Sequence, residues 1–569
     1  MVAAGGCAMR AFHNDGGLSV RATAGTNTVL LGWDLTDPAG CLGFGVHRTD
    51  HTEDEAYWLR GLKVFRSVVP HPGLGMDFSL RTHPVQGFQW GDYTAKPEHD
   101  YTYRVVAWGG TPGALTPLAD VRVDVRTEAE DDGRHGIWFN RGVAGSQAYV
   151  KRFGQFTPPV GASEDHPAFA WLSRGLGEAF VRFAGRANGA EWGLRGAFYE
   201  FTWRTGLAAL AAARDAGADV QLVVHGRDRD AAGKDSDTTA ADNHAAVAAT
   251  GLDDVVSWRT AANKSALQHN KFLVLTMAGQ PVAVWTGSTN LTQGAIFGHL
   301  NVGHLIGDPA VAQRFLDYWA QLADQTVTTA KLRLWSESTN PVDLAAPGIA
   351  TILSPRATTS PLLDGYAGAF DGGTSSAHIT GAFGLNKVFR QRLGIDRDVV
   401  RTVLLDQKPD AGQEIPTVDP DVRVSWGDYL HKVTFEQWAD EHLTNFNSWV
   451  KFIHTKIIMI DPLAPAPVTL TGSANYSDNS TTDNEENTVV IRGDGTAAGD
   501  AAARRVADVY LTEYQRLFMH FVFRDWAAKD AETGEGGGFL AEDDSWTARY
   551  YEPGGWRARQ RATFASPVA

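Results

Sequence analysis

Two pairs of residues that could do phosphoryl chemistry stand out in this sequence. Each pair is a histidine followed two residues later by a lysine: His269 with Lys271, and His454 with Lys456. Residues two apart on a strand project from the same face, so each stretch would place an imidazole beside an ammonium group. An imidazole can attack phosphorus or carry a proton, and an ammonium group can hold phosphate oxygens. We therefore expect a strand at each stretch, the second one over residues 452–461.

Each His-x-Lys pair is followed at the same sequence distance by a second motif. A Gly-Ser-x-Asn sequence follows each histidine at an equal offset, at residues 287–290 in the first copy and 472–475 in the second. The period from His269 to His454 is that of a duplicated domain and is too long for a solenoid repeat. The serines and asparagines that join the candidate site are Ser288, Asn290, Ser473 and Asn475.

These motifs resemble the phospholipase D superfamily, whose members carry two His-x-Lys motifs, each followed by Gly-Ser-x-Asn, in two halves of one chain. The resemblance covers about residues 135 to 525. It implies two α/β halves that share one active site. It also implies a covalent phosphohistidine that is passed to water or to an alcohol, with no cofactor and no metal ion.

The resemblance also implies a role for each residue. By analogy His269 is the nucleophile and His454 the general acid, although the residues alone do not assign these roles. Lys271 and Lys456 would hold the non-bridging oxygens. Two asparagines would add donors, and two serines would support the loop or the phosphate: Asn290, Asn475, Ser288 and Ser473.

Two carboxylates in the second half complete the expected constellation. Glu486 matches the family position whose carboxylate holds one histidine, although the sequence does not say which. Asp461 follows Lys456 by five residues and is expected to buttress the motif. The first half departs from the pattern, with Thr276 in place of the aspartate and Gly303 in place of the glutamate. One histidine could then be held by His304 or by a carboxylate from elsewhere.

Residues 1–130 have the pattern of an all-β sandwich. Short alternating stretches are separated by Gly, Pro and Asp, with no long helical period. Trp33 near the start and the Tyr101–Ala107 stretch near the end resemble a fibronectin type III module. This module could bind a substrate or a surface, or serve only in packing.

The rest of the chain alternates between strand-like and helix-like stretches, which is typical of an α/β architecture. We expect a helix over 168–184 with Pro167 at its start, a strand over 192–201, and a helix over 206–215. The polar stretch 226–242 could form a rim over a site. The predicted domains are a first phospholipase D-like half over 135–335, a second half over 350–525, and a tail over 526–569 that packs through its aromatic residues.

Composition limits the partners. The 569-residue chain has a formal charge of −15, which argues against a broad surface for tracking nucleic acid. We expect a monomer that acts on a phosphodiester, preferably a phospholipid, with transient contact to a membrane surface. The sequence shows neither a secretory signal nor a spanning stretch, so the default expectation is a cytoplasmic protein, with secretion still open.

Two rival hypotheses stay open. A nuclease of the same superfamily would share every catalytic residue, and a non-catalytic phosphate-binding scaffold would explain the altered first half. His225, His299 and His304 could bind zinc, but their spacing does not support a metal cage. We expect replacement of His299 to leave activity largely intact.

Overall fold

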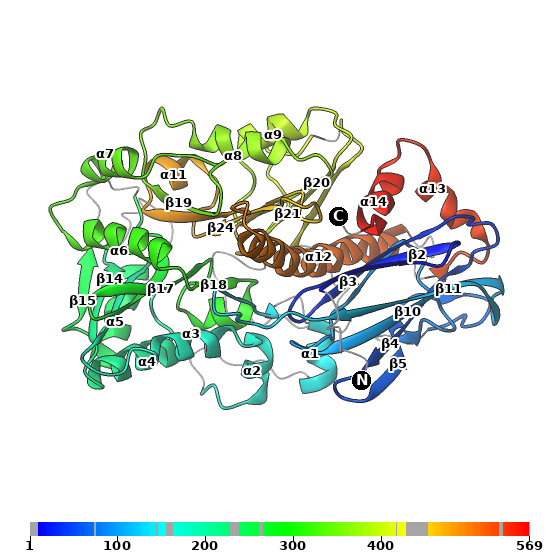
Figure 1. Cartoon of the computed structure of the whole chain (residues 1–569), viewed down its shortest axis with the longest axis horizontal. Coiled ribbons are helices and arrows are strands. Elements are labelled where there is room, and N and C mark those ends of the chain that lie inside the picture. Colours follow the sequence, from blue (N-terminus) through cyan, green and yellow to red (C-terminus); the bar gives the residue numbers. More distant parts are fainter. Residues whose placement is uncertain are drawn as a thin grey trace.

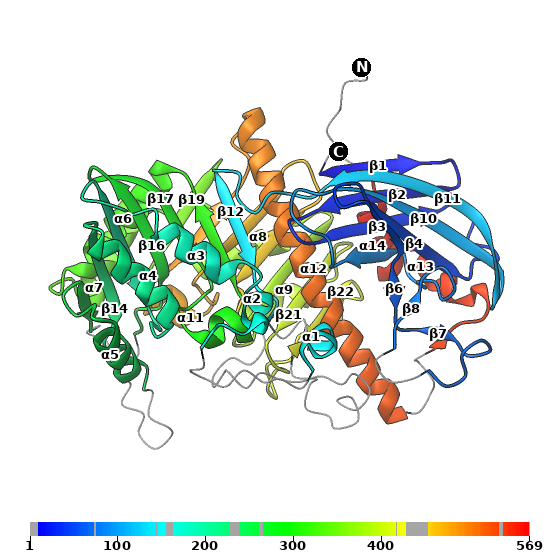
Figure 2. The same ribbon diagram turned by 90° about the horizontal axis from the view of Figure 1, so that it is seen from below.

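A computed structural model of the chain describes residues 9–72, 76–142, 146–154, 163–227, 238–260, 266–416, 418–427, 453–533 and 539–567. Phe452, most of the polar stretch 226–242, and residues 534–538 of the tail lie outside these ranges. The described part forms an N-terminal β-sandwich beside two α/β halves, with one long helix running between the sandwich and the halves (Figures 1 and 2). The mixed α/β class with two halves and an N-terminal β-rich region is confirmed.

The sandwich is made of two four-stranded sheets, ordered β1-β2-β3-β9 and β11-β10-β4-β5. Their inner faces bury a shared apolar core that contains Trp33, Tyr101 and Tyr103. Its identity as a fibronectin type III module stays a prediction. The strands are β1 (Arg10–Asn14), β2 (Leu18–Ala24), β3 (Val29–Leu35), β4 (Gly43–Asp50), β5 (Glu55–Trp58), β9 (Gln89–Asp92), β10 (Asp100–Thr111) and β11 (Ala114–Arg126). Short pairs are formed by β6 (Arg60–Gly61) with β8 (Phe78–Ser79), and by β7 (Val64–Phe65) with β26 (Phe539–Leu540).

The first half is a seven-stranded sheet in the order β12-β18-β17-β16-β13-β14-β15. Its strands are β12 (His135–Phe139), β13 (Trp192–Phe198), β14 (Asp219–His225), β15 (Val256–Arg259), β16 (Lys271–Met277), β17 (Gln280–Gly287) and β18 (Val302–Ile306). Its helices are α1 (Ser146–Phe153), α2 (Pro167–Ser173), α3 (Leu176–Ala184), α4 (Arg204–Asp215), α5 (Thr239–Thr250), α6 (Pro309–Ala323) and α7 (Thr329–Thr339), with a π-helix η2 (Gly294–Gly298).

The second half repeats this topology strand for strand, in the order β19-β25-β24-β23-β20-β21-β22. Its strands are β19 (Ile349–Ser354), β20 (Ser376–Gly381), β21 (Val400–Leu405), β22 (Val422–Trp426), β23 (Ile457–Ile460), β24 (Val468–Gly472) and β25 (Glu486–Ile491). Its helices are α8 (Leu362–Asp371), α9 (Lys387–Leu393), α11 (Asp478–Thr482) and α12 (Ala497–Thr533). The duplication read from the motif spacing is therefore a duplication of the whole sheet.

Two of the expected elements differ from the structure. The helix expected over 168–184 is broken into α2 and α3, because Arg174 and Gly175 adopt positive φ angles of 47° and 87°. The strand expected over 452–461 begins only at Ile457. Before this strand, the backbone N–H of His454 donates to the carbonyl oxygen of Leu300 in the other half. His454 therefore pairs with the other half and not with a neighbouring strand of its own sheet.

Helix α12 and the C-terminal tail join the bodies together. The core cluster that contains Val506, Tyr510 and Tyr514 of α12 also contains apolar side chains from both halves. The tail elements η4 (Asp544–Thr547), α13 (Ala548–Tyr551) and α14 (Trp556–Ala565) lie against the sandwich (Figure 1). Trp546 is buried there and donates from Nε1 to the carbonyl oxygen of Cys41, so the predicted packing role of the tail is confirmed.

Candidate active site

The two His-x-Lys motifs lie where the two sheets meet. Lys271 is the first residue of β16, and Lys456 immediately precedes β23. Each histidine donates its backbone N–H across to the other half: His269 to the carbonyl oxygen of Glu485 at 2.9 Å, and His454 to that of Leu300 at 3.0 Å. The fold therefore brings two motifs that are far apart in the sequence into one buried, pseudo-symmetric site.

The imidazole of His269 is held by Glu486 of the other half. Nδ1 of His269 lies 3.2 Å from Oε2 of the carboxylate, although the ring is turned away from good hydrogen-bond alignment. Such contacts often tighten only when substrate binds. The other carboxylate oxygen, Oε1, accepts from Ser480 Oγ at 2.9 Å and from Asn484 Nδ2 at 3.0 Å. Glu486 is thus fixed with one oxygen directed at His269.

The imidazole of His454 is held in the same way by Asn301 of the first half. Nδ1 of His454 lies 3.0 Å from Oδ1 of Asn301. The amide nitrogen of Asn301 donates to the carbonyl oxygen of Ala295 at 3.0 Å, which fixes Oδ1 as the acceptor. Nδ1 of His454 must then carry the proton, so Nε2 is its free nitrogen in the neutral ring.

Asn301, and not Gly303, occupies the position that corresponds to Glu486. Asn301 stands at the same offset from Ser288 as Glu486 does from Ser473. The backbone N–H of Ser288 donates to the carbonyl oxygen of Val302, and that of Ser473 donates to the carbonyl oxygen of Asn487. The alignment of Gly303 with the glutamate was therefore wrong by two positions.

Gly303 and His304 belong to the packing of the first half. A Cβ atom on Gly303 would lie 2.2 Å from Cζ2 of Trp285, so the absence of a side chain allows this indole to pack. His304 is buried between Nδ1 of His135 at 2.9 Å and the hydroxyl of Tyr510 at 3.0 Å. The expectation that His304 could replace the missing carboxylate was wrong.

Both lysines of the motifs are buried and donate to the backbone of their own histidine. Nζ of Lys271 lies 2.6 Å from the carbonyl oxygen of His269, and Nζ of Lys456 lies 2.7 Å from that of His454. Burial lowers the pKa of Lys271 to about 7, although Glu486 opposes this shift. Burial, reinforced by Lys271, also lowers the pKa of Lys456 well below its usual range. A bound anion would offset this burial and repulsion, so the pair of lysines favours an anionic ligand.

The same environment acts on the histidines. Burial lowers the pKa of His269 to about 4, with Lys271 adding to the shift and Glu486 opposing it. Burial, followed by Lys456, lowers the pKa of His454 well below its ordinary value. These shifts favour neutral rings at neutral pH, and a bound anion would favour their protonation.

The serines and Asp461 support the motif from behind. Ser288 Oγ donates to Oδ1 of Asn301 at 2.8 Å, and Ser473 Oγ accepts from the backbone N–H of Asn487 at 3.0 Å. Burial would raise the pKa of Asp461, but donors from Ser375 and other neighbours more than offset this and lower it. These contacts keep the loops in place and leave Asp461 tied to the backbone before β20.

The predicted asparagines differ in their contacts. Asn290 is buried and donates from Nδ2 to the carboxylate of Glu200. The backbone N–H of Asn475 donates to Ser480 Oγ at 3.1 Å, next to Glu486. Within the described ranges, neither asparagine has a hydrogen-bond partner for its side-chain Oδ1.

Sequence reasoning missed several residues of the site. Glu200, just beyond β13, acts on the charges of both motif lysines, and the Tyr199 ring lies 5.0 Å from that of His269. His299 is buried with its ring 4.9 Å from that of His454, so it belongs to the site and not to a remote surface. The equal offset after each serine could have identified Asn301, whereas no sequence signal marked Glu200.

The described ranges contain no group of three or more His, Cys, Asp or Glu side chains arranged to hold a metal ion. None of their helices combines the length and the apolar character needed to cross a membrane.

Comparison with known proteins gives one family match. Residues 186–323 and 395–506 match the family described as "Cardiolipin synthase, PLD-like domain". The matched segments fall in the first and the second half respectively. No curated protein matches this chain.

Several solved structures share weaker similarity. Phosphatidylserine synthase from Haemophilus influenzae Rd KW20 has 10% identity and a TM-score of 0.42, covering 64% of this chain and 92% of its own. The phospholipase D family member Nuc from Salmonella typhimurium has 28% identity and a TM-score of 0.20, covering 26% and 87%. Yeast tyrosyl-DNA phosphodiesterase has 13% identity and a TM-score of 0.31, covering 56% and 86%. Each α/β half therefore contains a segment that is similar to this PLD-like domain.

Proposed function

We propose that this chain is a metal-independent phosphodiesterase of phospholipase D type that hydrolyses or transfers phospholipid headgroups through a phosphohistidine. The observation that carries the proposal is the crossed support of the two histidines. Glu486 faces His269 and Asn301 faces His454, each from the opposite half. A binding scaffold has no need for two oriented imidazoles beside two buried lysines.

His269 is the proposed nucleophile because its partner is a carboxylate. In the first step, the Nε2 lone pair of His269 forms a bond to phosphorus while the bond to the leaving oxygen breaks. His454 takes up a proton at Nε2 when the anionic substrate binds, and this imidazolium ring gives that proton to the leaving oxygen. The phosphohistidine keeps a positive ring, which the charge of Glu486 stabilises. Lys271 and Lys456 bind the non-bridging oxygens throughout.

In the second step His454 acts as the base. Its Nε2 takes a proton from water or an alcohol, whose oxygen attacks phosphorus and releases His269. A neutral amide partner such as Asn301 suits this ring, because it leaves the imidazole free to gain and lose a proton. His454 therefore acts first as the general acid and then as the general base, while His269 forms the covalent bond to phosphorus.

Two residues at corresponding positions favour a lipid over nucleic acid. Phe198 pairs with Lys271, and the register of β20 with β23 aligns Gly381 with Lys456. Two residues further on, Glu200 therefore corresponds to Phe383, whose side chain is 61% exposed. An acidic group beside the site disfavours a polyanion, and an exposed aromatic ring suits an apolar substrate.

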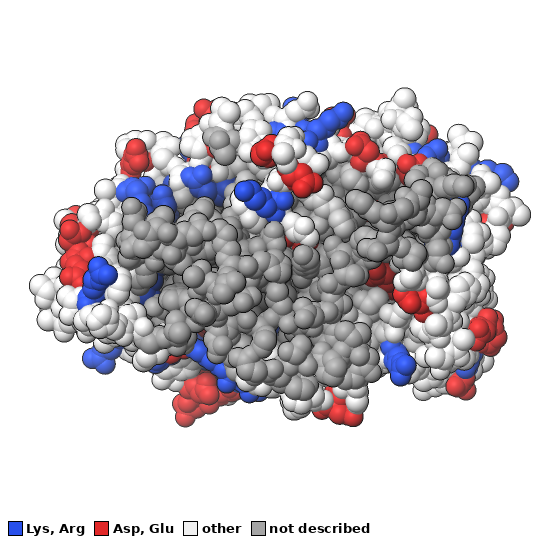
Figure 3. Space-filling view, turned by 180° about the vertical axis from the view of Figure 1, so that it is seen from behind, with Lys and Arg blue, Asp and Glu red and all other residues white. Residues whose placement is uncertain are grey.

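The surface charge agrees with this preference. On the face shown in Figure 3, Lys and Arg side chains of the described residues lie among Asp and Glu side chains. The chain as a whole carries a formal charge of −15. Nucleic-acid binding without sequence preference relies on many cationic contacts to phosphates. A nuclease of the same superfamily remains the alternative that the experiment must address.

The test uses the purified chain with a chelator present. Bis(p-nitrophenyl) phosphate reports phosphodiester cleavage, phosphatidylcholine vesicles report headgroup release, and a single-stranded oligonucleotide reports nuclease activity. We expect turnover of the first two, abolished by His269→Ala and by His454→Ala. The matched control is His13→Ala, which removes an exposed histidine of β1. Wild-type turnover by the His269 variant would overturn the mechanism, and cleavage of the oligonucleotide alone would replace the lipid substrate.

The two histidine roles have a separate test. Because p-nitrophenolate leaves without a proton, His454→Ala is expected to release one equivalent in a burst and to accumulate phosphohistidine at residue 269. Mass spectrometry after a rapid alkaline quench would locate the phosphoryl group. A phosphoryl group found on His454 of the wild-type protein would reverse the assignment.

A further inference from the structure

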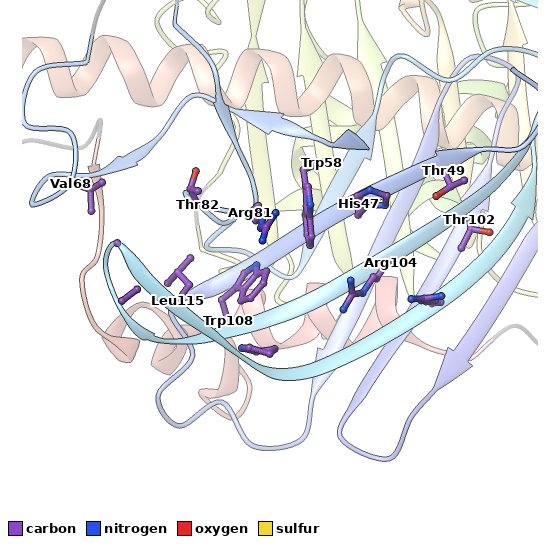
Figure 4. A pocket seen from close by; sticks show the side chains of 14 residues that line it. His47, Thr49, Trp58, Val68, Arg81, Thr82, Thr102, Arg104, Trp108 and Leu115 are labelled. Carbon is purple, nitrogen blue, oxygen red and sulfur yellow. The ribbon is translucent and has the colours of Figure 1, made fainter. Parts of the chain in front are cut away.

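A groove on the N-terminal sandwich lies outside the site described above. It runs along the outer face of the sheet β11-β10-β4-β5 and has a volume of about 870 Å³ (Figure 4). The segment between β5 and β9 closes one side through Val68, Arg81 and Thr82. The volume is in the range of small-ligand sites. Nothing in the proposed phosphodiesterase chemistry uses this groove.

Two indoles and an imidazole form a continuous aromatic strip in the groove. The ring centroids of Trp58 and Trp108 are 5.9 Å apart, and those of His47 and Trp58 are 5.2 Å apart. Gly45 makes room for both indoles, because a Cβ there would lie 2.4 Å from Nε1 of Trp108 and 2.9 Å from Cζ3 of Trp58. Both indoles remain partly exposed in the groove. The outer face of this sheet therefore exposes aromatic rings within the groove.

A row of basic side chains crosses the same face. The strand register places His47 opposite Arg104, and Arg104 opposite Arg122. Like charges directly opposite on neighbouring strands destabilise a sheet. Asp120 neutralises Arg104. No carboxylate or hydrogen-bond acceptor among the described residues pairs with the guanidinium group of Arg122.

Arg81 adds a second guanidinium group without such a partner in the described part of the chain. Burial, followed by the charges of Arg104 and Arg122, lowers the pKa of His47, which lies on the same face. In a chain with a formal charge of −15, this is a local cationic site beside exposed indoles.

We propose that this groove binds an anionic saccharide. The apolar faces of sugar rings would pack against Trp58 and Trp108, and a carboxylate, sulfate or phosphate substituent would bind Arg81 and Arg122. The ligand anchors the protein while the catalytic site, in the other domains, acts on its own substrate. Single-stranded nucleic acid also stacks on aromatic rings, so an oligonucleotide is included in the test as the rival ligand.

The test is a titration of the full chain, followed by tryptophan fluorescence and by calorimetry. The probes are tetragalacturonate and a heparin tetrasaccharide as anionic sugars, cellotetraose as a neutral sugar, and a short oligothymidylate. We expect at least one anionic sugar to bind with a Kd below about 1 mM, and the neutral sugar to bind at least about tenfold more weakly.

Variants identify the groove as the binding site. Trp58→Ala and Arg122→Gln are each expected to weaken binding of the anionic sugar at least about tenfold, while the turnover of bis(p-nitrophenyl) phosphate stays unchanged. The matched control is Arg314→Gln, which alters an exposed arginine on α6 of the first half. Arg122 is itself exposed, so its replacement leaves the core untouched.

Four results would overturn the proposal. They are no binding of either anionic sugar, equal binding of the neutral sugar, binding of the oligothymidylate alone, or binding that survives both groove substitutions. A loss of phosphodiesterase activity in the groove variants would contradict the separation of the two sites. Because these readouts do not depend on catalysis, failure of the proposed enzyme activity leaves the binding test intact.

Discussion

Replacement of Glu486 by glutamine is expected to reverse the tautomer of His269. Oε1 of Glu486 accepts hydrogen bonds from two groups that can act only as donors at this position. Asn484 offers its Nδ2, because its Oδ1 already accepts from the backbone N–H of Leu267 at 3.1 Å. Ser480 offers its hydroxyl hydrogen, because its oxygen already accepts from other donors, including the backbone N–H of Asn475. A glutamine must therefore place its carbonyl oxygen there and direct its NH₂ group at the ring.

An NH₂ group beside Nδ1 of His269 requires that nitrogen to be the acceptor. The proton then moves to Nε2, the atom that attacks phosphorus in the proposed mechanism. Loss of the carboxylate charge alone would cost about 1 kcal/mol, or roughly fivefold in rate. A comparable acid-to-amide change that fixes the wrong tautomer beside a catalytic histidine costs about 10⁴ in kcat. We expect Glu486→Gln to lower kcat by about 10³ to 10⁴.

The assay combines turnover with a direct view of the ring. Release of p-nitrophenol from bis(p-nitrophenyl) phosphate gives kcat, and nitrogen NMR of labelled histidine shows which ring nitrogen of His269 carries hydrogen. The matched control is Glu191→Gln, which alters an exposed glutamate just before β13. A loss of less than about tenfold, or a proton that stays on Nδ1 in the variant, would refute the reasoning.

Three further predictions follow from the same geometry. Because burial lowers the pKa of Lys271 to about 7, kcat/KM for the chromogenic diester should fall as the pH rises through that value and the ammonium group is lost. Lys271→Arg should change the position of this alkaline fall, because arginine keeps its charge, and an identical pH profile in the variant would contradict the assignment. Gly303→Ala should lower the free energy of unfolding by about 1–3 kcal/mol in urea denaturation, because the new Cβ meets Trp285 at 2.2 Å. An unchanged unfolding midpoint would show that the indole can move aside. The sequence alone led us to expect that His299 could be replaced with little loss, but its place beside His454 reverses this expectation. His299→Ala should reduce kcat by about 10- to 100-fold, because it removes the ring packed at 4.9 Å from His454. If the His299→Ala variant is as active as the His13→Ala control, His299 has only a structural role.

Local sequence spacing predicted the repeated part of this protein well. A histidine and a lysine two apart, followed at one fixed distance by Gly-Ser-x-Asn, predicted two copies of one unit, and the structure contains two sheets with the same strand order. The alternation within residues 1–130 predicted a sandwich with Trp33 in its core. These features depend on neighbours along the chain, where strand periodicity and turn residues act directly.

Several features were decided only by the tertiary structure. That Glu486 faces His269, and that Asn301 faces His454, results from hydrogen bonds between halves that are far apart in the sequence. The error at Gly303 arose because the stretches after the two serines fold differently, through a π-helix in one half and α11 in the other, while keeping the same length. Glu200 has no motif of its own and reaches the site because β13 lies beside β16. The sequence determined which groups could react, and the packing of one sheet against the other determined which nitrogen, amide and carboxylate meet, because those contacts form only after both halves bury their shared core.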